Sequence, residues 1–170
     1  RLTVEQANDI IRLIANMYFQ MIFTDGLFHA DPHPGNLLIL DDGRLGVLDF
    51  GKCGRLRDGM REAFIDFLAS VLTGDIEEST RCMLKVSPGP ADLDETRLQA
   101  DLEGWIETYF PGSAGSSTMH ADLGSAISAL LDIVREYNLQ MPTDMSLMLI
   151  VMMQLQGILE ESGSTLTLTQ

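Results

Sequence analysis

The chain has 170 residues, of which 45% are hydrophobic and 21% are charged, and this composition excludes a disordered protein. The net charge of −14 at pH 7 disfavours nucleic acid as a partner, because so acidic a surface repels polyphosphates. The most apolar stretch, Leu147 to Leu159, is interrupted by Gln154 and Gln156 and is too short and polar to cross a bilayer. Since no secretory signal opens the chain and its two cysteines fit no metal-ligand spacing, we expect a soluble, cytoplasmic protein with reduced thiols.

The first predicted element is a helix that begins near Thr3. Thr3 and Gln6 have the spacing of a capping box, in which each side chain satisfies a free backbone N–H at the helix start. Gly26 favours a left-handed residue that would end the helix. Between them, apolar residues recur with the helical period at Ile10, Leu13, Ile14, Met17 and Met21.

A β-hairpin is predicted after a loop in which Pro32 and Pro34 exclude a regular helix. Its strands are Leu37–Leu40 and Leu45–Leu48, joined by an Asp-Asp-Gly turn. The rest of the chain favours helices, followed by a polar tail at residues 162–170. These helices are predicted at residues 58–73, 75–86, 92–109, 120–138 and 143–161. The predicted fold class is therefore mainly α with one small β-hairpin.

The unusual chemistry lies in the loops at the two ends of this hairpin. His29, Asp31 and Asn36 have the spacing H-x-D-x-x-x-x-N, and an Asp-Phe-Gly occupies Asp49–Gly51. In kinases with these motifs, the first Asp orients the attacking hydroxyl, whereas the Asn and the Asp of Asp-Phe-Gly bind metal ions. Magnesium prefers hard oxygen ligands and few protein contacts, which Asn36 and Asp49 would supply. The two motifs together predict a metal–phosphate site in which Asp31 faces the acceptor.

Simpler interpretations of the same residues stay open. Asp31, Asn36 and Asp49 are residue types that also cap turns, although the paired spacing argues against a turn cluster alone. Lys52 is a candidate to contact the phosphates of the cofactor, and the alternative is a solvated loop lysine.

The histidines have alternatives of their own. A ring bonded to the backbone is the more typical role for His29 than acid–base chemistry. In a metal-dependent hydrolase, His29 and His33 would instead bind a metal together with Asp31, and His120 is the one other histidine that the chain offers.

At these residues the chain resembles a known family. The run FHADPHPGNLLI…DGRLGVLDFGKCGRL looks like the signature of the UbiB/AarF/ADCK family, atypical protein-kinase-like proteins tied to coenzyme Q and other isoprenoid-lipid metabolism. The later stretch LQMPTDMSLMLIVMMQLQGILE is similar to a helix of that family. The resemblance implies that residues 1–161 form the C-terminal lobe of a protein-kinase-like fold, with the catalytic loop and hairpin at 28–57. The nucleotide-gripping N-lobe is then expected upstream of Arg1, outside this chain.

The resemblance also implies roles for individual residues. Asp31 would be the catalytic residue, with Asn36 and Asp49 as ligands of Mg²⁺ and thereby of ATP. A further group would shape the loops, namely His29, His33, Pro34, Gly35, Phe50 and Gly51. The full-length protein is expected to bind Mg²⁺ and ATP, and this chain alone to bind them weakly or not at all and to be inactive.

The segment after Asp-Phe-Gly bears on the acceptor. Only Lys52 to Arg57 separate Gly51 from the next predicted helix, and no Ala-Pro-Glu motif follows. In ordinary protein kinases that motif closes a long segment on which peptide substrates lie. The sequence therefore favours a small-molecule or lipid acceptor, such as a quinone precursor, or ATP hydrolysis.

Three interpretations of function follow. The leading one is the C-terminal catalytic lobe of an atypical ATP- and Mg²⁺-dependent kinase or ATPase linked to ubiquinone and isoprenoid-lipid metabolism, with a biosynthetic protein complex as a further partner. A non-catalytic module that binds nucleotide or lipid is the second. The third, a small-molecule phosphotransferase of the aminoglycoside or choline type, is disfavoured by Gly51, which that group typically replaces. Membrane contact is expected only through regions outside this chain.

Overall fold

The structure is a computed structural model, and it describes residues 4–40, 42–111 and 122–161. These residues form two compact units. Unit 1 contains the residues up to Leu56 together with those from Ser146 onward, and unit 2 contains Arg57–Met145. The predicted fold class, mainly helical with small antiparallel strand pairs, is confirmed. The division into a kinase-like lobe at 1–161 and a tail at 162–170 stays a prediction, and the tail lies outside the described residues.

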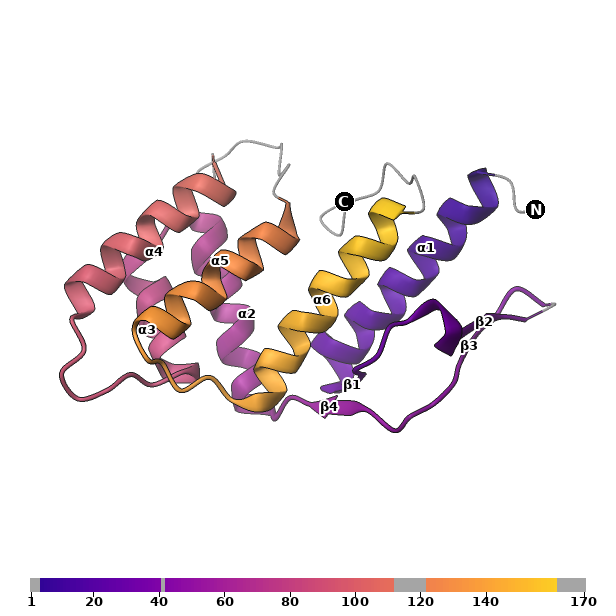
Figure 1. Cartoon of the computed structure of the whole chain (residues 1–170), viewed down its shortest axis with the longest axis horizontal. Coiled ribbons are helices and arrows are strands. Elements are labelled where there is room, and N and C mark those ends of the chain that lie inside the picture. Colours follow the sequence, from indigo (N-terminus) through magenta and orange to yellow (C-terminus); the bar gives the residue numbers. More distant parts are fainter. Residues whose placement is uncertain (1–3, 41, 112–121, 162–170) are drawn as a thin grey trace. The chain divides into compact units, whose positions relative to one another are not determined.

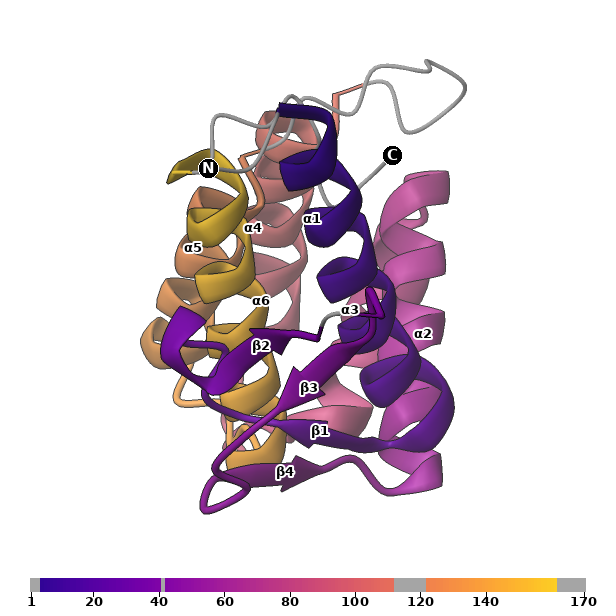
Figure 2. The same ribbon diagram turned by 90° about the vertical axis from the view of Figure 1, so that its right-hand side faces the viewer.

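Unit 1 is built from two helices and two pairs of short strands (Figures 1 and 2). In chain order, its elements are α1 (Val4–Phe19), a π-helical segment (Gln20–Asp25), β1 (Leu27–His29), a 3-10 turn (Pro34–Asn36), β2 (Leu37–Ile39), β3 (Leu45–Val47), β4 (Cys53–Arg55) and most of α6 (Thr143–Glu161). Gly26 has φ 64° and ends the first helical stretch, as predicted. The capping residue Thr3 lies outside the described residues.

The predicted hairpin is present, and a second strand pair accompanies it. Strands β2 and β3 pair antiparallel with Leu37 opposite Val47. Strands β1 and β4 also pair antiparallel, with Phe28 opposite Gly54. The second pair is not apparent from the sequence, because three-residue strands show no period-2 pattern.

The core of unit 1 lies between α1 and α6, which run side by side (Figure 1). One stripe of α1 and the segment after it is buried: Ile11, Ile14, Tyr18 and Ile22. Residues of α6 are also buried, and two of them, Met152 and Leu155, line a pocket together with Tyr18 and Ile22. The buried residues of α6 are Met148, Leu149, Val151, Met152 and Leu155. Burial of such side chains contributes roughly 1.5–3 kcal/mol each, so these two helices supply a large part of the stability of unit 1.

Unit 2 consists of four helices, α2 (Asp58–Thr73), α3 (Ile76–Val86), α4 (Glu95–Tyr109) and α5 (Leu123–Glu136). Three of them begin at an aspartate whose carboxylate accepts a backbone N–H of the first turn: Asp75, Asp94 and Asp122. Trp105 is buried between α4 and α5, and its indole Nε1–H donates to the Ala126 carbonyl at 2.9 Å.

All five helices predicted after the hairpin are present, and the larger differences lie at the starts of two of them and at one end, where the helix predicted to reach residue 138 ends at Glu136. The predicted starts near residues 92 and 120 become Glu95 and Leu123. The reason is the capping residues, because Asp94 and Asp122 have extended or non-helical backbone angles and lie just outside the helices that they cap. Over the described ranges, no helix is both long and apolar enough to cross a membrane.

Candidate functional site

The two motifs come together at one end of the β1–β4 pair. Because the strands are antiparallel, the end of β1 at His29 lies opposite the start of β4 at Cys53. The Ala30 N–H extends this pairing by donating to the Lys52 carbonyl at 2.9 Å. The loop that contains Asp31 and the Asp-Phe-Gly segment therefore lie next to each other, as the spacing of the motifs suggested.

His29 joins these two loops. Its side chain is 1% exposed, its Nδ1 accepts the Asp31 N–H at 3.3 Å, and its Nε2 lies 3.0 Å from the Leu48 carbonyl and 2.8 Å from the Asp49 carbonyl. Since carbonyls only accept and the Asp31 N–H only donates, the hydrogen-bond pattern assigns the ring proton to Nε2. The ring thus fixes the backbone of both candidate aspartates, and its role is structural.

Asn36 joins the loop to the hairpin. Its backbone carbonyl accepts the Leu48 N–H at 2.8 Å, and its side-chain Nδ2 donates to the Asp31 carbonyl at 3.2 Å. Because that partner is a carbonyl, the amide nitrogen must face it and the amide oxygen is directed elsewhere. The oxygen, which is the atom needed for a metal ligand, is therefore not the atom used in this bond.

Asp49 has an unusual backbone. Its φ is 55°, in the left-handed region that residues other than glycine seldom adopt. Two hydrogen bonds stabilise this conformation. His29 Nε2 donates to the Asp49 carbonyl, and the Gly51 N–H donates to Asp49 Oδ1 at 3.1 Å. Aspartate tolerates this region better than most residues, and such conformations are concentrated at functional sites. Asp49 is exposed, so its carboxylate is accessible to a ligand.

The remaining candidates lie around this centre with different exposures. Asp31 and Asn36 are half-buried, whereas Lys52 is exposed. His33 is exposed, and its Nδ1 accepts the Gly35 N–H at 3.0 Å. A Cβ on Gly35 would lie 3.0 Å from that nitrogen, a tight contact with an exposed ring. Phe50 is 62% exposed, and its ring meets the His29 ring edge-on with centroids 5.4 Å apart.

The hydrolase alternative finds no support in this geometry. Both ring nitrogens of His29 are engaged with the backbone, so neither offers a lone pair to a metal. Within the described part of the chain, no three His, Cys, Asp or Glu side chains lie close enough to hold a metal ion together. His120 lies outside that part. Two oxygen ligands, Asn36 and Asp49, are nevertheless compatible with magnesium, which keeps water and phosphate oxygens in the rest of its shell.

One buried polar residue, Tyr18, is not apparent as a candidate from the sequence patterns. Tyr18 lies on the buried stripe of α1, and both burial and the negative charge of Asp31 raise the pKa of its hydroxyl. Its one distinguishing feature in the sequence is that Tyr18 alone among the four residues of the buried stripe carries a polar side-chain atom. Helical periodicity treats such a residue as core, so the signal is weak.

We predict that His29→Leu destabilises unit 1. The substitution removes the partner of the Asp31 N–H and of two carbonyls, and leaving buried groups unpaired costs about 1–3 kcal/mol each. Thermal unfolding checks this, with His33→Ala as the matched control. His33 is exposed and bonds only to a residue two positions away, so its replacement is expected to cost about 0.5 kcal/mol. Equal losses in the two variants would contradict the linking role of His29.

Comparison with known proteins agrees with the motifs. Residues 2–83 match the family described as ABC1 atypical kinase-like domain. Among curated proteins, an uncharacterized Synechocystis protein is 29% identical over 153 residues, which are 90% of this chain and 36% of that protein. An uncharacterized chloroplastic aarF domain-containing protein kinase of Arabidopsis thaliana is 38% identical over 88 residues, 52% of this chain and 16% of that protein.

A third relative covers more of the chain than the second one does. The Arabidopsis chloroplastic protein ACTIVITY OF BC1 COMPLEX KINASE 1 is 26% identical over 133 residues, 78% of this chain and 19% of that protein. The chain thus spans between 16% and 36% of the length of these three relatives. Residues 2–83, the segment that contains both motifs, are thus similar to the ABC1 atypical kinase-like domain, and the relatives of the chain include proteins named aarF domain-containing protein kinases.

Proposed function

We propose that this chain is the C-terminal catalytic lobe of an atypical ATP- and Mg²⁺-dependent kinase or ATPase. The observation that carries the proposal is the link through His29, which holds the backbone of Asp31 and of Asp49 at one place. Asn36 is bonded into the same network through the Asp31 carbonyl. The buried ring of His29 bonds to the carbonyls of Leu48 and Asp49, which lie nineteen and twenty residues further along the chain. A cluster of residues that only cap turns would not require such a connection between two loops.

The donor set fits magnesium. Asn36 offers an amide oxygen and Asp49 an exposed carboxylate, both hard oxygen ligands. When bound, the metal ion would neutralise charge on the phosphates. The protein's own contribution is then positioning, since Asn36 and Asp49 hold the cofactor and Asp31 orients the acceptor hydroxyl or a water. Lys52 adds a positive charge on the segment that follows Asp49.

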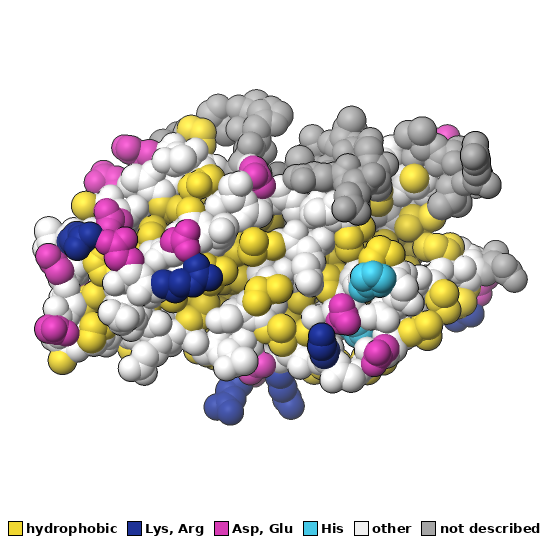
Figure 3. All heavy atoms as spheres, viewed as in Figure 1, with side chains coloured by type: hydrophobic (Ala, Val, Ile, Leu, Met, Phe, Trp, Pro, Cys, Tyr) yellow, Lys and Arg dark blue, Asp and Glu magenta, His cyan; other side chains and the backbone are white. Residues whose placement is uncertain are grey.

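The surface of the hairpin supports a nucleotide as the ligand. Leu38, Ile39 and Leu48 are exposed although they are large apolar residues. Figure 3 shows apolar side chains on the surface over β2 and β3. The flat base of a nucleotide would cover part of this apolar surface. Without a ligand, the same surface stays exposed to water.

The acceptor is proposed to be a small molecule or lipid. After Gly51 the chain turns directly into β4, which pairs back onto β1, and α2 begins at Asp58. This short path leaves no segment on which a peptide could lie. A link to ubiquinone or other isoprenoid-lipid metabolism rests on the family resemblance alone.

The first test is calorimetric titration of ATP and ADP, with and without Mg²⁺. Both this chain and a longer protein with its native upstream residues should be measured. We expect the longer protein to bind ATP only with Mg²⁺ and this chain to bind more weakly. No binding by the longer protein would overturn the proposal. Mg²⁺-dependent binding without phosphate release or transfer would instead support a non-catalytic nucleotide-binding module.

A further inference from the structure

Asn36 is held in place by three hydrogen bonds. Its Nδ2 donates to the Asp31 carbonyl, its carbonyl accepts the Leu48 N–H, and its N–H donates to the His33 carbonyl at 2.8 Å. The remaining polar group is the side-chain oxygen Oδ1, which is the proposed ligand of Mg²⁺. The third of these bonds joins Asn36 to the residue at which its own turn begins.

The 3-10 turn Pro34–Asn36 depends on His33 for the partners of its N–H groups. Pro34 has no N–H. The Gly35 N–H donates to His33 Nδ1 at 3.0 Å, and the Asn36 N–H donates to the His33 carbonyl. Both N–H groups of the turn are therefore bonded to one residue. Because so short a turn has few hydrogen bonds of its own, the loss of one of them has a large effect on its conformation.

The sequence around His33 favours this capping position. A residue that precedes proline is restricted to extended backbone conformations, and His33, which precedes Pro34, has φ −59° and ψ 137°. A capping residue adopts such non-helical angles. On its other side, Pro32 is buried and anchors the loop in unit 1. The backbone of His33 is thus set for capping by its neighbours along the chain.

Packing does not account for the imidazole ring of His33. The residue is exposed, so its ring contributes little apolar burial. Since Nδ1 accepts the Gly35 N–H, the hydrogen-bond pattern assigns the ring proton to Nε2. Among the residues that the structure describes, this is the one hydrogen bond that the side chain makes. The ring therefore acts on the rest of the loop through its cap of the turn.

We propose that His33 is a positioning residue for Asn36. Its ring and its carbonyl fix the turn, and the turn together with the Asp31 carbonyl limits the directions that the amide oxygen of Asn36 can take. A metal ligand whose orientation is fixed before binding loses less conformational entropy when the metal binds. The inference rests on the proposed function only for the statement that this oxygen binds Mg²⁺.

Amide hydrogen exchange of this chain without any ligand, followed by NMR, tests the positioning. In His33→Ala we expect the Asn36 N–H to exchange about fivefold faster than in the unchanged chain, because the turn opens more often without its cap. In His33→Asn we expect a rate within about twofold of the unchanged chain. Asparagine accepts a backbone N–H two positions further along, as Nδ1 of His33 does. Equal rates in all three chains, or no rescue by His33→Asn, would overturn the proposal.

Asp42→Ala is the matched control for the type of bond. Asp42 Oδ1 accepts the Arg44 N–H at 3.1 Å, so this variant also removes a bond from a side chain to an N–H two positions further along. The bond lies in the turn between β2 and β3, at the end of the hairpin away from Asn36. We expect exchange of the Asn36 N–H to be unchanged. An acceleration as large as that in His33→Ala would contradict a specific role of His33.

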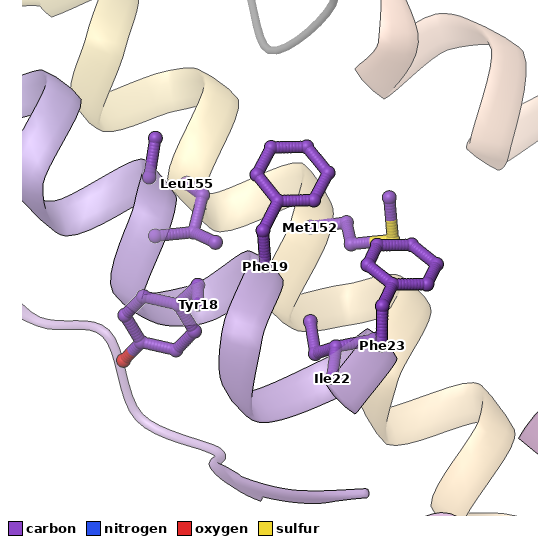
Figure 4. Close-up of a pocket in the computed structure, with 7 residues that line it drawn as sticks. Tyr18, Phe19, Ile22, Phe23, Met152 and Leu155 are labelled. Atoms are coloured by element: carbon purple, nitrogen blue, oxygen red, sulfur yellow. The ribbon is translucent and has the colours of Figure 1, made fainter. Parts of the chain in front are cut away.

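Leu155→Ala is the control for a general loss of stability. Leu155 lies with Tyr18 and Ile22 in the apolar core between α1 and α6 (Figure 4). Its truncation leaves a cavity, so we expect a clearly lower midpoint of thermal unfolding and an unchanged exchange rate at Asn36. We expect the reverse for His33→Ala. If both variants accelerated exchange at Asn36 equally, the turn would open only when unit 1 unfolds, and the proposal would be wrong.

In the longer protein, the loss of position should also weaken ligand binding. We expect His33→Ala to lower the affinity for ATP in the presence of Mg²⁺ about tenfold, and His33→Asn to restore it, as measured by calorimetry. The exchange experiment involves no nucleotide, so the absence of ATP binding would overturn the proposed function and leave the test of the turn decisive. Faster exchange in His33→Ala with unchanged ATP affinity would support the positioning and contradict the metal role of Asn36.

Discussion

Asp49→Asn is expected to abolish Mg²⁺-dependent ATP binding by the longer protein, whereas Asp31→Asn leaves that binding intact and stops turnover. Asp49 is the exposed carboxylate at the centre of the linked loops, and replacing it removes the charge that attracts the metal. We expect affinity for ATP in the presence of Mg²⁺ to fall about 100-fold or more. Asp31→Asn removes the group that orients the acceptor, so kcat should fall by about 10²–10⁴ at unchanged affinity.

Calorimetry and a phosphate-release assay separate these two effects. Asp42→Asn is a suitable control because it makes the same change of charge on the same hairpin. Asp42 lies in the turn, where its carboxylate pairs with Arg44, and we expect binding and turnover to be unchanged. Equal loss of ATP affinity in Asp31→Asn and Asp49→Asn would contradict the division of roles between the two aspartates.

Gly54→Ala is expected to destabilise unit 1 severely. A Cβ at this position would lie 2.2 Å from Cζ of Phe28 and 2.7 Å from each Cε of that ring. Phe28 is 1% exposed, so its ring has no free space into which to move. Overpacking in a core costs about 1–3 kcal/mol, and here it acts directly on the β1–β4 pair that brings the two loops together.

Thermal unfolding measures this cost, and Gly46→Ala serves as its control. Gly46 is also a strand glycine of unit 1, but a Cβ there would meet Leu38 at 3.6 Å, an ordinary contact distance. We expect this variant to change the unfolding midpoint little. If Gly54→Ala were as stable as Gly46→Ala, then Phe28 would not be packed against β4 as described.

Most of the helical architecture could be predicted from the sequence. Helices form through contacts between residues three or four positions apart, so periodicity and capping aspartates such as Asp75 locate them. The hairpin was equally predictable, since its turn and both strands lie in one short stretch. The errors in the helices lie at their ends: two starts, where Asp94 and Asp122 serve as caps, and the end of α5, which is Glu136.

The candidate site was predicted as a list of residues and not as an arrangement. Motif spacing selected Asp31, Asn36 and Asp49, and their metal and catalytic roles stay predictions. The left-handed backbone of Asp49 could not be predicted, because aspartate does not favour φ near 55° unless surrounding contacts impose it.

The sequence by itself determined the helices, the hairpin and the identity of the candidate residues, because each depends on neighbours close along the chain. The tertiary structure alone decided how they meet. The β1–β4 pair and the two bonds of His29 Nε2 both join segments far apart in sequence. Such contacts leave no local pattern, because their free energy is gained only when the whole chain has folded.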